Sequence, residues 1–336
     1  MAEHSAPVVA WYAHHQGAGH VTRAVAVASR MTTEVVILSS AVRPSEWPED
    51  HWVQLPDDAD GGGTDHTAGG VVHWAPLDHD GYRQRMGLVA DWVLHHRPRL
   101  VVSDVSVEVA LLARLLGIPV VVTVMAGDRA DRPHTAAYDA ATALVAAWPP
   151  EVGGSVVRGW ASRWDEKTTF VGAFSRFDDR RAEPPQGRRQ VTVLWGRGDT
   201  ASDLVTIDAA MAATPDWSWT LCDGTTSADA VWEHLQSADV VVLHGGQNAV
   251  AEVAAARRPA IVLPQSRPHD EQLHLARGLA HLGLGHPQAS WPAATAWPDL
   301  LATASSADPA AWSHWSDGGG AARYARRLDA LVGSDG

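Results

Sequence analysis

The segment His244-Gly245-Gly246-Gln247-Asn248 places two glycines between a short apolar segment and a helical one. Glycines let a helix start come close to a ligand, and the free N–H groups there attract anions. Such a turn is therefore suited to a phosphate group. We expect Asn248 to cap the following helix, because its side chain can accept a hydrogen bond from a first-turn N–H.

Carboxylates and an amide that suit sugar hydroxyls follow this turn. Glu252 lies one helical turn beyond Asn248 on the same face, where it can accept hydrogen bonds from a ribose diol. The alternative is an ordinary surface position for Glu252. Beyond the next apolar segment, Asp270 and Gln272 are expected on the same rim and suited to sugar hydroxyls. The alternative there is that Asp270 and Glu271 are ordinary acids of a first helical turn.

A second glycine turn, HHQGAGH, ends at His20. Gly17 and Gly19 permit tight backbone geometry, and His20 is expected at the sheet edge where open α/β sheets bind ligands. A neutral imidazole there can act as a general base, and a solvent-facing histidine is the alternative. The dinucleotide fingerprint G-x-G-x-x-G is not met, because Thr22 occupies its third glycine position.

Alternating strand and helix patterns place these turns in βαβ units with parallel sheets covered on both faces. The expected strands are 8–12, 35–39, 100–103, 119–124, 143–147, 190–195, 218–222, 240–244 and 259–263. The expected helices include 21–31, 87–96, 105–116, 200–213, 249–257 and 270–282. The charged segment 175–189, which contains Pro184 and Pro185, is expected to be a linker between a first domain of 1–174 and a second of 190–336.

Composition excludes several classes of protein. The 336 residues carry a net charge of −13, which argues against nucleic-acid binding. Cys222 is the single cysteine, so an intramolecular disulfide and a CxxC metal site are excluded. We expect no signal peptide and no membrane-spanning segment, and therefore predict a cytoplasmic protein.

The segment 239–272, DVVVLHGGQNAVAEVAAARRPAIVLPQSRPHDEQ, strongly resembles the donor-binding half of GT-B glycosyltransferases. It is most similar to the family 28 group, which includes the peptidoglycan N-acetylglucosaminyl transferase. The N-terminal GAGHVTRAVAVA resembles that superfamily's first glycine loop. The resemblance implies two Rossmann-like, doubly wound domains that face a cleft, with a nucleotide sugar bound by the second. It also implies a last helix, about 321–332, that crosses back to the first domain.

The resemblance also implies roles for individual residues. The diphosphate would meet Gly245, Gly246 and Asn248, the ribose Glu252, and the sugar Asp270 and Gln272. The full donor-binding set is Gly196, Arg197, Gly198, His244, Gly245, Gly246, Gln247, Asn248, Glu252, Asp270, Glu271 and Gln272. In inverting relatives a histidine of the first glycine loop is the general base and an aspartate supports it.

His20 and Asp104 match that base and its supporting acid in layout. A carboxylate can orient the imidazole and stabilise the imidazolium that forms. As an alternative or additional role, Asp104 would cap the helix 105–116. The acceptor is expected in the first domain, near His73, Trp74, Asp128 and His134.

The predicted reaction is inverting transfer of a hexosyl group, glucosyl or N-acetylglucosaminyl, from a UDP-sugar to an acceptor hydroxyl. No cofactor and no metal are expected, because the Asp-x-Asp triplets at 58–60 and 78–80 lie away from the expected diphosphate site. The expected partners are small molecules, and a lipid-linked acceptor at a membrane surface is an open possibility. Two alternatives share the fold: a UDP-sugar 2-epimerase, which needs no acceptor, and a non-catalytic protein that binds nucleotide sugars.

Overall fold

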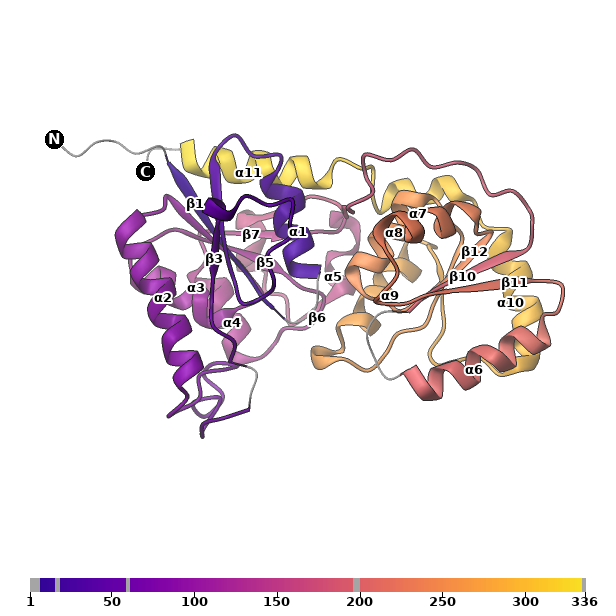
Figure 1. The fold of residues 1–336 in the computed structure, drawn as a ribbon, viewed down its shortest axis with the longest axis horizontal. Helices are drawn as coiled ribbons and strands as arrows, with labels where there is room; N and C mark the ends of the chain where they lie inside the picture. The colour runs from indigo at the N-terminus through magenta and orange to yellow at the C-terminus, as the bar shows by residue number, and fades with distance from the viewer. Residues whose placement is uncertain (1–6, 16–18, 59–60, 196–199, 334–336) are drawn as a thin grey trace.

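Two parallel β-sheets organise the chain in the computed structural model, which describes residues 7–15, 19–58, 61–195 and 200–333. We call the units built on the seven-stranded and the five-stranded sheet the first and the second domain (Figure 1). The first sheet has the order β3-β2-β1-β4-β5-β7-β9 and the second β11-β10-β12-β13-β14. Their strands pair in parallel and are largely buried, as expected of sheets covered on both faces.

The strands of the first sheet are β1 (Val8–Ala13), β2 (Glu34–Ser39), β3 (Trp52–Gln54), β4 (Leu100–Asp104), β5 (Val120–Val124), β7 (Ala143–Ala146) and β9 (Thr168–Phe170). Those of the second sheet are β10 (Gln190–Leu194), β11 (Ser218–Cys222), β12 (Val240–Leu243), β13 (Ala260–Val262) and β14 (His286–Pro287). A separate pair joins β6 (Gly127–Asp128) and β8 (Val157–Arg158). Each strand expected from the sequence is present, with ends shifted by a residue or two.

The helices are α1 (Gly19–Ala28), α2 (Asp80–His96), α3 (Val107–Leu115), α4 (Arg132–Ala140), α5 (Gly153–Val156), α6 (Thr200–Ala213), α7 (Ala228–Ser237), α8 (Gln247–Ala256), α9 (Glu271–His281), α10 (Trp297–Ser305) and α11 (Gly320–Gly333). Helix α2 begins at Asp80 instead of Gly87, because His79 accepts a hydrogen bond from the Tyr82 N–H and caps it. The sequence patterns had not indicated α4, α7 or α10.

Helix α11 leaves the second domain and lies on the first one, next to α1 (Figure 1). The Tyr324 hydroxyl is 2.7 Å from Thr123 Oγ1 on β5, and its ring packs 5.4 Å from that of Trp11 on β1. Tyr324 and Leu328 are fully buried in the apolar cluster that covers this face of the first sheet. The last helix therefore completes the core of the first domain.

The two domains also touch through α5 and α9. Val152 and Val156 face Gly278 so closely that a Cβ at Gly278 would overlap Val156. One buried apolar cluster runs from the first domain through these residues into the second. This contact and α11 therefore join the two domains.

Candidate active site

The strand β4 and the helix α1 bring Asp104 and His20 together. Asp104 is the last residue of β4 and is completely buried, while His20 lies in the first turn of α1. His20 Nδ1 is 3.4 Å from Asp104 Oδ1. The two residues that the sequence analysis paired as base and supporting acid thus lie in contact at the carboxyl edge of the first sheet.

A third residue, Arg23, shares this carboxylate. Arg23 Nη1 is 2.7 Å from Asp104 Oδ1, and its Nη2 donates to Gln247 Oε1 at 3.0 Å, across the gap between the domains. Burial alone would raise the pKa of Asp104, but the charge of Arg23 and the contacts of Arg23 and His20 outweigh it and hold the pKa below its usual value. Asp104 is therefore a carboxylate at neutral pH.

The expectation that Asp104 caps the next helix is wrong. Ser106 caps α3, because its hydroxyl accepts from the Val109 N–H at 3.2 Å. Val105, between Asp104 and Ser106, has a φ of 86°, a conformation that a β-branched residue rarely adopts. This strained residue turns the chain away from β4, so the Asp104 carboxylate faces α1 and not the end of α3.

The second glycine turn faces α1 from the other domain. Helix α8 begins at Gln247 with Gly246 as its N-cap, so the expectation of an Asn248 cap is wrong. The Asn248 side chain lies against Gly19 instead, and a Cβ at Gly19 would collide with its amide. Gly245 is packed equally tightly, because a Cβ there would lie 2.8 Å from the Gln272 carbonyl oxygen. Gly245 is thus required by the close approach of a backbone carbonyl, whereas Gly19 faces the movable end of a side chain.

Glu252 forms an ion pair that the sequence analysis missed. Arg176 Nε, from the segment between β9 and β10, is 2.9 Å from Glu252 Oε1. Burial raises the pKa of Glu252, although Arg176 partly offsets the effect. The gap lined by Arg23, Arg176, Asn248 and Glu252 has a volume of only about 10 Å³, which is no more than one water molecule needs. A nucleotide can enter only if these side chains move.

The other residues expected to bind the donor differ from one another in burial and in contacts. The His244 ring packs on Trp195, with its Nδ1 3.2 Å from the Leu263 carbonyl oxygen. Gln272 is buried, and its Oε1 accepts from the Gln265 N–H at 2.9 Å. Asp270 is exposed with a φ of 53°, and Glu271 lies against Gly127 of the first domain. Gly17, Gly196, Arg197 and Gly198 lie outside the described residues.

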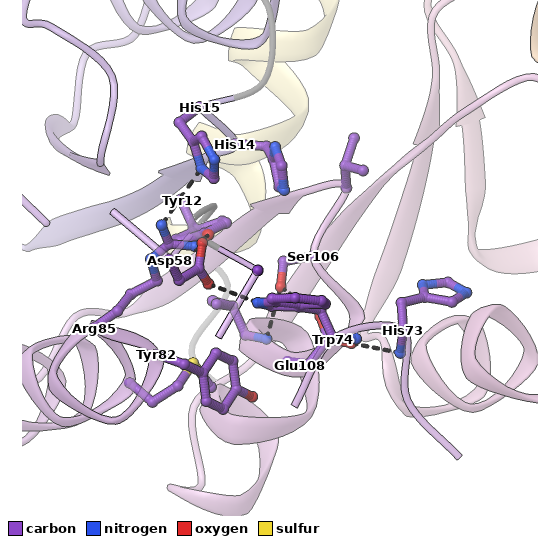
Figure 2. A pocket seen from close by; sticks show the side chains of 14 residues that line it. Tyr12, His14, His15, Asp58, His73, Trp74, Tyr82, Arg85, Ser106 and Glu108 are labelled. Atoms are coloured by element: carbon purple, nitrogen blue, oxygen red, sulfur yellow. Dashed lines mark hydrogen bonds and ion pairs between the residues drawn. The ribbon is translucent and has the colours of Figure 1, made fainter. Parts of the chain in front are cut away.

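A cavity of about 300 Å³ opens in the first domain beside the catalytic candidates (Figure 2). It is lined by Tyr12, His14, His15, Asp58, Gly61, His73, Trp74, Tyr82, Arg85, Met86, Val105, Ser106, Glu108 and Val109. The ring of His14 lies 6.0 Å from that of His20, so the cavity ends one side chain away from the candidate base. Burial, with His20 and His15 nearby, lowers the pKa of His14 to about 3, so this ring is neutral at pH 7.

Polar contacts fix the walls of this cavity. Arg85 pairs with the buried Asp58 at 2.8 Å, and Asp58 Oδ2 accepts from Trp74 Nε1 at 3.1 Å. Glu108 accepts from the backbone N–H groups of His73 and Trp74. Of the four expected acceptor residues, His73 and Trp74 line the cavity and Asp128 and His134 do not. Asp128 instead pairs with Arg158 at 3.0 Å.

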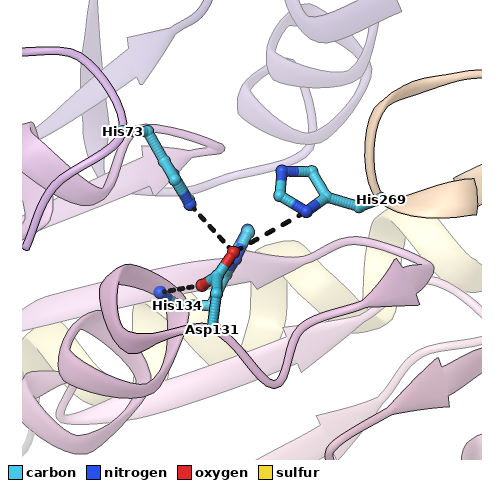
Figure 3. Close-up of side chains that lie close together, drawn as sticks. All are labelled: His73, Asp131, His134 and His269. Carbon is cyan, nitrogen blue, oxygen red and sulfur yellow. Dashed lines mark hydrogen bonds and ion pairs between the residues drawn. The ribbon is translucent and has the colours of Figure 1, made fainter. Parts of the chain in front are cut away.

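His134 belongs to a separate group at the boundary between the domains. It lies with His73, Asp131 and His269 in a cluster in which one nitrogen or oxygen atom of each side chain is within 4.8 Å of the others (Figure 3). His73, Asp131 and His134 belong to the first domain, and His269 belongs to the second. No sequence pattern indicates this cluster, because its members come from three separate segments.

We predict that Arg23→Met lowers the free energy of unfolding by about 3–5 kcal/mol, because it leaves the buried Asp104 carboxylate without its strongest partner. The Arg23→Met/Asp104→Asn double variant should recover part of this loss, as a double-mutant cycle in urea would show.

The matched control is Arg30→Met. Arg30 also pairs with an aspartate, Asp179 at 2.6 Å, but that carboxylate is 84% exposed. Arg30→Met should lower the free energy of unfolding by less than about 1 kcal/mol. Equal losses in Arg23→Met and Arg30→Met would contradict the role assigned to the buried pair.

Comparisons with known proteins bear on the family and the fold of the chain. Residues 185–286 match the family model described as the glycosyltransferase family 28 C-terminal domain. No curated protein matches the chain in sequence. Among the described residues, no helix is both long and apolar enough to cross a membrane.

Solved structures of glycosyltransferases share the fold over nearly the whole chain. The kitacinnamycin glycotransferase has 16% identity and a TM-score of 0.63, with 98% of this chain and 100% of that chain covered. MurG of Acinetobacter baumannii has 16% identity and a TM-score of 0.60 over 98% of this chain and 99% of that one. UGT89C1 of Arabidopsis thaliana, complexed with UDP-L-rhamnose, has 14% identity and a TM-score of 0.65, with 98% of this chain and 99% of that chain covered. The chain therefore has the GT-B fold of these glycosyltransferases, and its residues 185–286 match the family 28 C-terminal domain.

Proposed function

We propose that the chain transfers a hexosyl group from a UDP-sugar to an acceptor hydroxyl with inversion at the anomeric carbon, and that His20 is the general base. The observation that carries this proposal is the contact of His20 with the buried Asp104, between the 300 Å³ cavity and the glycine turn of the second domain. An imidazole held by a carboxylate is a suitable base near pH 7.

In the proposed step, the acceptor hydroxyl gives its proton to His20 Nε2, since Nδ1 faces Asp104. The acceptor oxygen bonds to the anomeric carbon as the bond from that carbon to the diphosphate oxygen breaks, and UDP leaves with the electron pair. Asp104 orients the ring and stabilises the imidazolium. Arg23 keeps Asp104 ionised but also shares its charge, so Asp104 serves as an orienting group more than as a strong counter-ion.

The donor half of the proposal rests on the glycine turn before α8. Its backbone N–H groups and the positive end of the α8 dipole would stabilise the departing diphosphate without a metal or cofactor. Glu252 would bind the ribose diol after its ion pair with Arg176 opens. Asp270 and Gln272 would bind the sugar.

The acceptor half rests on the first-domain cavity. Its volume is at the small end of the range for ligand pockets, and it combines the rings of Tyr12, Trp74 and Tyr82 with the charges of Asp58, Arg85 and Glu108. We propose that it takes a small acceptor, or one end of a larger one, that carries an aromatic or sugar-like ring and hydroxyl groups. Ring stacking and hydrogen bonds to the charged side chains would position the hydroxyl toward His20.

We expect the protein to bind UDP selectively and without magnesium. Calorimetric titrations with UDP, dTDP, GDP and NAD, each with and without Mg²⁺, measure this directly. Selective binding of dTDP or GDP would keep the fold but contradict the UDP assignment. Incubation with UDP-N-acetylglucosamine alone should yield no other UDP-sugar, whereas conversion would favour the 2-epimerase.

Glu252→Ala is expected to weaken UDP binding by about 10- to 100-fold, because hydrogen bonds to a charged group contribute about 1.5–3 kcal/mol. Arg176→Ala is the matched partner variant. It should leave UDP binding unchanged or tighter, since it removes the group that occupies Glu252 in the ligand-free structure. Equal weakening by both substitutions would mean that the assignment of Glu252 to the ribose is wrong.

His20→Ala should lower kcat by about 10²-fold or more and leave the Kd for UDP unchanged, because it removes the base but no donor contact. His95→Ala, which changes an exposed histidine of α2, is the control and should have normal turnover. Near-normal turnover in His20→Ala would exclude His20 as the base.

A further inference from the structure

The cluster of His73, Asp131, His134 and His269 has a geometry that the proposed transfer step does not use (Figure 3). Asp131 is the N-cap of α4, His134 lies in its first turn, and His73 comes from the segment before α2. His269 reaches the cluster from the second domain. The rings and the carboxylate converge on one point at the domain boundary.

The distances within the cluster match those between the ligands of a small cation. Asp131 Oδ2 is 3.2 Å from His73 Nε2 and 3.6 Å from His269 Nδ1. Two ligands that bind a tetrahedral zinc ion at about 2.0–2.1 Å lie roughly 3.3 Å from each other. Both distances are close to this value, and one ligand atom from each of the four residues lies within 4.8 Å of the others.

His134 has a different part in this geometry. Arg129 Nη1 lies 2.9 Å from His134 Nε2, and because a guanidinium only donates hydrogen bonds, Nε2 must accept. The ring proton of the neutral form is then on Nδ1, which donates to Asp131 Oδ1 at 2.7 Å. His134 thus holds the second carboxylate oxygen of Asp131 and leaves Oδ2 for a cation, as outer partners of metal ligands commonly do.

The backbone fixes the position of His269 independently. His269 and Asp270 have φ angles of 60° and 53°, a strained conformation for two consecutive non-glycine residues. The His269 carbonyl oxygen packs on Gly127, where a Cβ would come within 2.5 Å of it. The second domain therefore docks this turn on the first domain so that the ring reaches Asp131.

We propose that His73 Nε2, Asp131 Oδ2 and His269 Nδ1 bind a divalent zinc-type cation that joins the two domains, with His134 as a positioning residue. Two imidazole nitrogens and one carboxylate oxygen favour Zn²⁺ over Mg²⁺ or Ca²⁺, which prefer oxygen ligands. The fourth coordination position remains for water or a substrate oxygen. The ion acts on the relative position of the domains, and the inference does not depend on the proposed donor, acceptor or base.

A second group with suitable atoms, His15, Asp57 and Asp58, is a weaker candidate. Arg85 already pairs with Asp58 at 2.8 Å and lies 3.9 Å from Asp57. This guanidinium occupies the place of a cation. The group still provides a useful control, because its loss should leave zinc binding unchanged.

The test is titration of the full chain, after dialysis against a chelator, with Zn²⁺ by calorimetry and with Co²⁺ by absorption spectroscopy. We expect one Zn²⁺ per chain, a Co²⁺ spectrum typical of tetrahedral coordination, and a higher Tm when zinc is added. His269→Ala and His73→Ala should each weaken zinc binding by about 100-fold or more and remove the Tm increase. His134→Ala should weaken binding by roughly 10- to 100-fold but keep the tetrahedral spectrum.

The control variants are His281→Ala, an exposed histidine of α9, and His15→Ala from the second group. Both should bind zinc like the unsubstituted protein. Failure of the unsubstituted protein to bind zinc would overturn the proposal, as would binding that His269→Ala and His73→Ala leave intact. Loss of binding in His15→Ala alone would place the ion at the other group and equally overturn it. None of these outcomes bears on UDP binding, which is measured separately.

Discussion

The charge of Asp104 is the constraint on which the centre of this protein depends. A carboxylate that is completely buried destabilises the fold unless cations and hydrogen bonds compensate it. Arg23 and His20 provide this compensation from one face of α1. Because Arg23 also donates to Gln247, the same charge connects the candidate base to the helix that follows the second glycine turn. A residue of the first domain thus joins the two domains beside the candidate base.

Much of the fold could be predicted from the sequence, because strands buried on both faces are apolar throughout and the glycine turns mark where they end. The pairing of β6 with β8 could not be predicted, because strands of two residues show no periodic pattern in the sequence. Helix α2 was predicted too short because its start is set by the side chain of His79, which an amphipathic pattern does not reveal.

The site was predictable where it is local in sequence and not where it is formed by tertiary contacts. Placing Asn248 and Asp104 as caps failed because Gly246 and Ser106 precede the helices and the two polar side chains face other elements. Arg23 lies 81 positions from Asp104, and a buried arginine has no distinctive pattern around it. Its spacing from His20, one turn along α1, was the single available signal.

The return of α11 to the first domain has a consequence for biosynthesis. The strands of the first sheet are complete at Phe170, but the helix that completes, beside α1, the cover of one face begins at Gly320. At translation rates of about 5–20 residues per second, roughly 8–30 s separate the two events on the ribosome. During this interval the part of the face that Tyr324 covers, at Trp11 on β1 and Thr123 on β5, lacks its covering helix. The nascent chain therefore presents an apolar surface to chaperones until the final helix emerges.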